Sequence, residues 1–213
     1  MKTEPQASNS GLILNDNDQQ LKAAAGEIIL LTGAVGSGKS LWLHRLAGLT
    51  DLPAHISSMI GGKPVAKARG SALMLFDRQP QLWLGQTVAE ELCFGLKERP
   101  EPETLHTVLS QWGLSELDLG SDLATLNRLQ GVRLSLASIS LAAPKLALLD
   151  NPTDALPEQD AFTLRDDISA WASHSVTTVV VTSNRWHDWR SVATQNWWIG
   201  DADKLPQWGE IQT

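Results

Sequence analysis

The sequence predicts an α/β fold with a largely parallel central sheet and a helical insertion, and three observations support this prediction. Short apolar runs alternate along the chain with longer amphipathic ones. The apolar runs show no polar alternation, as is typical of strands buried on both faces of a parallel sheet. A glycine-rich stretch, residues 33–40, separates one such run from an amphipathic run. Loops at the carboxyl ends of parallel strands bind ligands, so this stretch is the first place to look for a site.

The predicted elements follow in chain order. Residues 27–32 form the first buried strand, because residues 28–31 are all isoleucine or leucine, without polar alternation. Residues 41–49 form a helix, since their leucines recur on one face, and a turn at 50–53 ends it. Further strands are predicted at 72–76, 146–149, 177–182 and 196–199.

The segment between the predicted strands 72–76 and 146–149 differs in character from the rest of the chain. Residues 87–96 and 102–112 read as helices, with a charged, proline-containing break at 97–103 and no strand between them. The 213 residues are therefore expected to form one domain, residues 1–213. We expect its core to comprise residues 1–76 and 146–213 and its helical subdomain about 77–145.

Composition excludes several classes of protein. The net charge is −7, from 17 Lys and Arg against 24 Asp and Glu, so the chain lacks the positive field that nucleic-acid binding requires. With Cys93 as its one cysteine, it forms no internal disulfide. No signal-peptide core or membrane-spanning run is recognisable, which favours a cytoplasmic protein or one held at a membrane by partners. Nine Trp without any Tyr hint at docking surfaces.

The glycine-rich stretch satisfies the phosphate-loop pattern G-x-x-x-x-G-K-S in full. Its glycines let successive backbone N–H groups face an anion, its lysine reaches the terminal phosphates of a nucleotide, and its last hydroxyl ligates magnesium. A glycine-rich turn with an unrelated lysine is the alternative. The predicted nucleotide-binding residues are Gly33, Ala34, Val35, Gly36, Ser37, Gly38, Lys39 and Ser40.

A phosphate loop needs an acidic partner for the magnesium ion. Asp150 follows the four apolar residues 146–149 and therefore stands at the end of a second buried strand. It could instead cap the next helix. With the phosphate loop present, Ser40 and Asp150 are the predicted magnesium ligands.

The order of these motifs resembles the nucleotide-binding subunits of ABC transporters. Residues 86–96 look like the TVEEEVAFGL segment that opens the helical subdomain of cobalt- and vitamin-importer ATPases. Leu126 precedes Asp150 by the spacing that separates the LSGGQ signature from the metal aspartate in that family. The resemblance implies ATP and Mg²⁺ as cofactors and transmembrane permease subunits as partners. It also implies pairing with a second ATPase subunit or with a second copy of the chain, on the inner face of the cell membrane.

The same resemblance places substitutions at the family's catalytic positions. Asn151 replaces the glutamate that polarises the attacking water, and losing a positioned general base costs about 10²- to 10⁴-fold in rate. Ser183 replaces the histidine on the γ-phosphate, and Asp77 replaces a glutamine that touches magnesium and water. Residues that could compensate are His187 for the histidine and Gln79 or Gln81 for the glutamine.

The signature segment is changed as well. Its glycines give the backbone close access to the nucleotide of the opposite subunit. Here the segment consists of Leu126, Asn127, Arg128, Leu129 and Gln130. Leu129 is expected to obstruct that approach, whereas Arg128 either offers a charge to the phosphate or is a solvated surface residue. No aromatic residue precedes Gly33, so the family's stacking platform for adenine is missing.

Trp83 and Leu84 lie where the resembled family meets its membrane subunit, and they are the predicted docking residues. Packing of Trp83 inside the fold is the alternative. These residues together favour an ATP-binding subunit of an ABC transporter with weak or no hydrolysis. A regulatory or scaffolding pseudo-ATPase is the first alternative. A small phosphotransferase is the second, although the chain has no arginine-rich lid segment.

Overall fold

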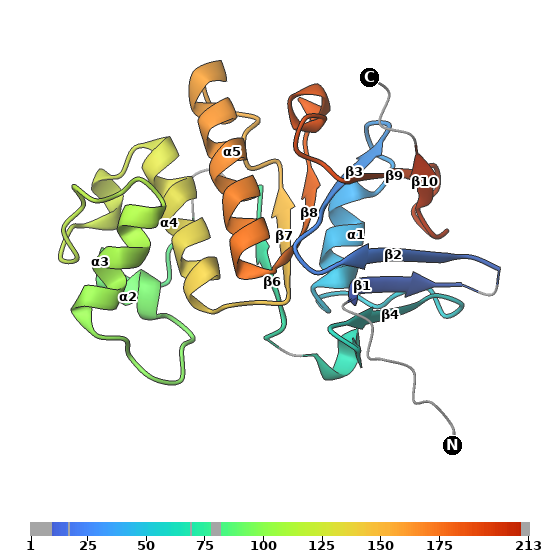
Figure 1. Cartoon of the computed structure of the whole chain (residues 1–213), viewed down its shortest axis with the longest axis horizontal. Helices are drawn as coiled ribbons and strands as arrows, with labels where there is room; N and C mark the ends of the chain where they lie inside the picture. The colour runs from blue at the N-terminus through green and yellow to red at the C-terminus, as the bar shows by residue number, and fades with distance from the viewer. Residues whose placement is uncertain (1–9, 17, 69, 78–81, 210–213) are drawn as a thin grey trace.

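The computed structural model describes residues 10–16, 18–68, 70–77 and 82–209 of the chain. Its centre is a six-stranded sheet in the order β10-β9-β3-β8-β7-β6 (Figure 1). Every neighbouring pair is parallel except β10 and β9, which confirms the predicted α/β class with a largely parallel sheet. The strands are β3 (Ile28–Gly33), β6 (Ala72–Leu75), β7 (Leu146–Asp150), β8 (Thr178–Thr182), β9 (Gln195–Ile199) and β10 (Gln207–Gly209).

The continuous apolar runs became strands because both faces of this sheet are covered. All five residues of β7 and all five of β8 are buried. Ile28 and Leu30 of β3 belong to one core cluster, and Ile29 and Leu31 belong to a second. Successive side chains point to opposite faces of a strand, so each cluster fills one side of the sheet.

A second, antiparallel sheet covers the first helix, α1 (Lys39–Leu46). Leu12, Leu14 and Leu21 from this sheet share a cluster with Trp42 and Leu43 of α1, so the helix is packed between the two sheets. The strands of this sheet were not predicted from the sequence, because they are short and polar on one face. They run in the order β2-β1-β4-β5 and comprise β1 (Ser10–Asn15), β2 (Gln20–Ala24), β4 (Ser57–Ile60) and β5 (Lys63–Pro64).

Helices cover the opposite face of the central sheet. The described residues between β6 and β7 form helices and loops without a named strand, and Figure 1 shows α2, α3 and α4 together at the end away from the antiparallel sheet. The α-helices are α2 (Val88–Cys93), α3 (Pro102–Gln111), α4 (Arg128–Leu141) and α5 (Glu158–Ser175). Short 3₁₀ turns are η1 (Val65–Lys67), η2 (Leu123–Thr125) and η3 (Trp186–Trp189).

The inserted helices share their core with the sheet. Leu92 of α2, Leu109 of α3 and Leu134 of α4 are all buried and belong to the cluster that contains Leu149 of β7. Within the described part of the chain, no helix has both the length and the apolar character that crossing a bilayer requires.

Candidate functional site

The phosphate loop leaves the carboxyl end of β3 and runs directly into α1. Gly36 and Gly38 have φ angles of +80° and +94°, in the left-handed region that glycine adopts at little cost. A side chain at Gly33 would place its Cβ 2.7 Å from the carbonyl oxygen of Ile199, so close backbone approach also demands glycine there. The three glycines of the motif are therefore required by the path of the loop.

The loop is curled around the ammonium group of Lys39. Its Nζ donates hydrogen bonds to the carbonyl oxygens of Gly33, at 3.0 Å, and Ala34, at 3.2 Å. The Oγ of Ser37 is buried without a hydrogen-bond partner among the described residues. Ser40 is exposed at the start of α1 and Val35 projects into solvent at 96% exposure. A cradle closed by a lysine, with an unsatisfied hydroxyl inside it, fits a phosphate group at a helix N-terminus.

Asp150 is the last residue of β7 and is 6% exposed. Its Oδ1 accepts a hydrogen bond of 2.6 Å from the Oγ1 of Thr182, the last residue of the neighbouring strand β8. This bond fixes the carboxylate at the carboxyl edge of the sheet, where β8 lies between β7 and β3, the strand that carries the phosphate loop. Thr182 was not singled out from the sequence. A polar residue that ends a valine-rich strand was the available signal.

Asn151 adopts a left-handed conformation, with φ +49°. Its backbone N–H donates to the carbonyl oxygen of Thr182, and its side-chain Nδ2 donates a 2.9 Å hydrogen bond to Oδ2 of Asp77. Its Oδ1 is buried without a donor among the described residues. Asp77, Asp150, Asn151 and Arg128 all line one small cavity of about 10 Å³, which is close to the space that a single water molecule needs.

Ser183, which follows β8, is tied to Asp154. Its Oγ donates a 2.5 Å hydrogen bond to Oδ1 of Asp154, whose Oδ2 accepts from the backbone N–H of Asn184 at 2.7 Å. His187 is exposed, and its ring stacks on Trp186 with centroids 3.6 Å apart. Gln79 and Gln81, the other residues considered as substitutes, lie outside the described residues.

The signature segment forms the start of α4. Asn127 caps the helix by accepting from the backbone N–H of Gln130 at 2.9 Å, and the Gln130 side chain accepts from the N–H of Asn127 at 3.0 Å. Arg128 is exposed. Leu126 and Leu129 are half-buried and pack against the core cluster, so the side chain of Leu129 is directed partly into the fold.

The predicted docking residues differ from each other in their surroundings. Trp83 is half-buried and packs against the core cluster, whereas Leu84 is 60% exposed. Leu84 lines a groove of about 560 Å³ between the sheet and the inserted helices, together with the exposed Leu82 and Phe94. Trp83 is absent from that lining. The carboxylate of Glu91 holds the loop by accepting hydrogen bonds from the N–H groups of Leu84 and Gly85, both at 2.9 Å.

Several of the predicted site residues line two separate cavities. Gly33, Lys39 and Ser183 line one cavity, and Asp77, Arg128, Asp150 and Asn151 line the smaller one. Among the described residues, no cluster of three or more His, Cys, Asp or Glu could hold a metal ion. A magnesium ion bound by Ser40 and Asp150 would therefore need further oxygen ligands, which nucleotide phosphates provide.

The chain is similar to known proteins over most of its length. Residues 17–154 match the family model described as ABC transporter. The aliphatic sulfonates import ATP-binding protein SsuB of Shigella flexneri is 32% identical over 172 residues, which cover 80% of this chain and 65% of that protein. The cytochrome c biogenesis ATP-binding export protein CcmA of Pseudomonas putida is 31% identical over 169 residues, or 74% of this chain and 77% of the relative. This chain thus spans less than two-thirds of the length of the sulfonate-import relative.

A solved structure shares the fold at lower identity. CbiO1 from Clostridium perfringens, described as part of the ABC transporter complex cbiONQ, superposes with a TM-score of 0.80 at 16% identity. The superposition covers 96% of this chain and 90% of that one.

Proposed function

The chain belongs to the ABC transporter ATP-binding family, and from that premise we propose that it is the nucleotide-binding subunit of an importer-type transporter that binds MgATP but hydrolyses it slowly or not at all. The SsuB relatives are named as import proteins and CbiO1 as part of a transporter complex. On this proposal the chain lies at the inner face of the membrane, bound there by permease subunits.

ATP binding is supported by the intact phosphate loop. Lys39 would reach the terminal phosphates once they displace its bonds to Gly33 and Ala34. The unsatisfied Oγ of Ser37 would gain a phosphate acceptor. Ser40 and Asp150 would hold the magnesium ion, which neutralises the phosphates and orients them.

The hydrogen bond between Asn151 and Asp77 is the single observation that carries the proposal of weak hydrolysis. A carboxamide can orient a water molecule through its oxygen, and Asn151 Oδ1 is buried and lacks a donor beside a cavity the size of one water. The carboxamide of Asn151 has no basic atom that accepts a proton at neutral pH. Its amide nitrogen is already engaged by Asp77. Asn151 would therefore position a water molecule without accepting its proton, and the Oδ2 of the neighbouring carboxylate, Asp77, is engaged by the Asn151 amide.

Two further contacts support the same conclusion. The hydroxyl of Ser183 donates a hydrogen bond to Asp154, and the side chain is too short to replace a histidine at the γ-phosphate. In the resembled family, the signature of one subunit completes the site of the other. Here that segment offers the exposed cation Arg128 in place of glycine backbone. Hydrolysis requires all these parts together, so losing several leaves a nucleotide-binding subunit with little turnover.

Docking to a permease is supported by the groove beside Leu84. Leu82, Leu84 and Phe94 are 69%, 60% and 56% exposed, which makes this a concentrated apolar surface. Glu91 keeps the backbone of Leu84 in place, so the surface is organised before a partner binds. Since Trp83 packs inward, we assign the contact to Leu84 and its groove neighbours and give Trp83 the role of supporting the loop.

Calorimetry and phosphate release on the purified chain test the two halves of this proposal. MgATP should bind to the native chain and to Lys97→Ala, an exposed-lysine control, and its affinity should fall about tenfold or more in Lys39→Ala. The native chain should release phosphate at the background rate. Equal binding by Lys39→Ala and the native chain would contradict the assigned nucleotide site, and turnover abolished by Lys39→Ala would contradict weak hydrolysis.

A further inference from the structure

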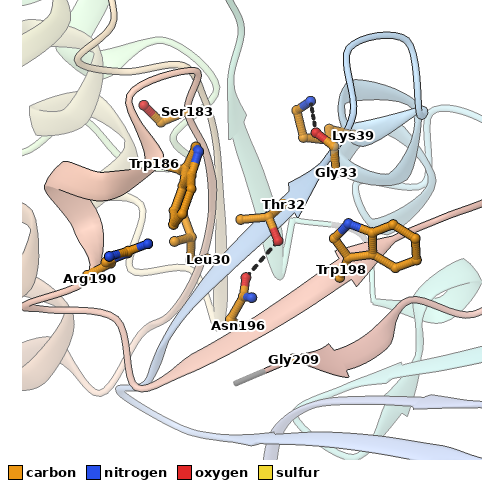
Figure 2. A pocket seen from close by; sticks show the side chains of 10 residues that line it. All are labelled: Leu30, Thr32, Gly33, Lys39, Ser183, Trp186, Arg190, Asn196, Trp198 and Gly209. Atoms are coloured by element: carbon orange, nitrogen blue, oxygen red, sulfur yellow. Dashed lines mark hydrogen bonds between the residues drawn. The ribbon is translucent and has the colours of Figure 1, made fainter. Parts of the chain in front are cut away.

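A cavity of about 400 Å³ lies next to the phosphate loop on the face of the central sheet opposite α1. Leu30 is part of its floor, and Leu30 belongs to the core cluster on that face, whereas Ile29 and Leu31 pack on the α1 side. Figure 2 shows Thr32 and Asn196 at the centre of the floor, with Trp186 and Trp198 on opposite sides of β3. Its volume is in the range of small-molecule sites.

The polar lining of this cavity is cationic. Lys39 and Arg190 both line it, and none of the described lining residues is acidic. This contrasts with the chain as a whole, whose net charge is −7. The apolar part of the lining includes two indole rings. His187 and Arg190 both lie against the ring of Trp186, so Trp198, at 45% exposure, is the ring that offers a face to a planar group. A ligand that matches both features has an aromatic ring and a negative charge.

Arg190 is a half-buried cation without an anionic partner among the described residues. Its guanidinium lies over the ring of Trp186, with Cζ 4.3 Å from the centroid. The residue is half-buried, its Nε is fully buried, and its side chain has no hydrogen bond or ion pair with any described residue. Four other arginines each pair with an aspartate: Arg45, Arg133, Arg165 and Arg185. Desolvating a cation without a partner is costly, and a carboxylate or phosphate satisfies a guanidinium through two parallel hydrogen bonds.

Asn196 adds a second donor on the floor. Its Oδ1 accepts a 2.8 Å hydrogen bond from the Oγ1 of Thr32, which fixes the orientation of the amide. The Nδ2 group then has hydrogen atoms to donate and no acceptor among the described residues. The free polar groups at this end of the cavity are therefore donors, and they suit an acceptor-rich anion.

We propose that this cavity binds a small planar aromatic anion, with its ring against Trp198 and its carboxylate or phosphate at Arg190 and Asn196. The site is separate from the nucleotide's phosphate cradle but shares a wall with it through Gly33 and Lys39. Binding at this site would depend neither on ATP nor on transport.

Calorimetry with 2-naphthoate tests the proposal, and the neutral isostere 2-naphthamide is the matched ligand. The native chain should bind 2-naphthoate about tenfold or more tightly than 2-naphthamide, because a charge-assisted bond to Arg190 is lost with the amide. Arg190→Gln should remove this preference, whereas Arg99→Gln, at an exposed loop position, should retain it. Trp198→Leu should weaken both ligands, since Trp198 is a 45% exposed wall residue.

Titration with AMP distinguishes a phosphate from a carboxylate as the preferred anion. AMP binding that is lost in Arg190→Gln and kept in Lys39→Ala would identify a nucleoside monophosphate site in this cavity. Binding of both anions that depends on Lys39 and not on Arg190 would assign them to the phosphate loop and overturn the proposal. Equal affinity of the native chain for 2-naphthoate and 2-naphthamide would overturn it as well, whether or not the variants fold.

Discussion

Asn151 donates a hydrogen bond from Nδ2 to Oδ2 of Asp77 across 2.9 Å, although 74 residues separate them in the chain. On our proposal, both stand at positions where other members of the family have different catalytic residues. The bond joins the end of β7 to the end of β6, which are neighbouring strands of the central sheet. The two substitutions therefore form a matched pair, because each residue is the hydrogen-bond partner of the other.

This pairing predicts that restoring one catalytic residue is insufficient. Asn151→Glu alone should release phosphate within about twofold of the native chain, because the new carboxylate would face that of Asp77 and because Ser183 still lacks a histidine's function. The triple variant Asn151→Glu, Asp77→Gln, Ser183→His should be at least about tenfold faster. Steady-state phosphate release measures both.

Adding Lys39→Ala to the triple variant provides the control, since it should return the rate to background. Full turnover by Asn151→Glu alone would show that Asp77 and Ser183 do not limit the reaction.

The left-handed backbone at Asn151 leads to a stability prediction. A residue with a Cβ pays about 1 kcal/mol to adopt φ +49°, unless it is asparagine or aspartate, whereas glycine does not. Both Asn151→Gly and Asn151→Ala lose the bond to Asp77, so their difference isolates the backbone. Asn151→Gly should be the more stable of the two by about 1 kcal/mol in urea unfolding. At Asn184, where φ is not positive, alanine should equal or exceed glycine.

The central sheet could be predicted from the sequence because burial on both faces leaves an uninterrupted apolar run. The strands β3, β6, β7, β8 and β9 all fall within two residues of their predicted bounds. The antiparallel sheet was missed, since β2 alternates between exposed and buried residues over only five positions. Helix α5 was also missed, although Ala161, Leu164, Ile168 and Ala172 are buried at helical spacing, because the intervening residues are polar or aromatic.

Site residues could be predicted directly from their position in the sequence only where they belong to a short, local motif. The phosphate loop and Asp150 each follow an apolar strand, so sequence position alone identified them. Thr182 and Asp154 reach the site through tertiary structure and were not predicted. The family resemblance placed Asp77 there, but its hydrogen bond to Asn151 is visible only in the fold. Arg190 was not identified for the same reason, because its lack of a counterion is visible only in the fold.

The hydrogen bond from Thr182 to Asp150 predicts a role in metal-dependent binding. Thr182→Val keeps the shape of the side chain and removes the donor to Oδ1, so Asp150 would lose its fixed orientation. Unfolding free energy should fall by about 1–3 kcal/mol, because a buried carboxylate loses a partner. Calorimetry should show weaker binding of MgATP than in the native chain and no change for ATP without magnesium. Thr163→Val, at an exposed position of α5, should behave as the native chain does in both measurements.

The exposed apolar residues of the groove beside Leu84 should be required for docking to a permease. Leu84→Asp and Phe94→Asp place a charge on exposed apolar residues of the groove, so they should abolish co-purification of permease subunits from detergent extracts while leaving urea unfolding nearly unchanged. Trp83→Ala should instead lower the unfolding free energy by about 2 kcal/mol, since the ring packs against the core cluster. Val176→Asp, an exposed apolar position outside the groove, is the matched control and should retain the permease. Retention of the permease by both groove variants would exclude this groove as the docking surface. If a Trp83→Ala chain that remains stably folded no longer co-purifies the permease, Trp83 is the residue that anchors the contact.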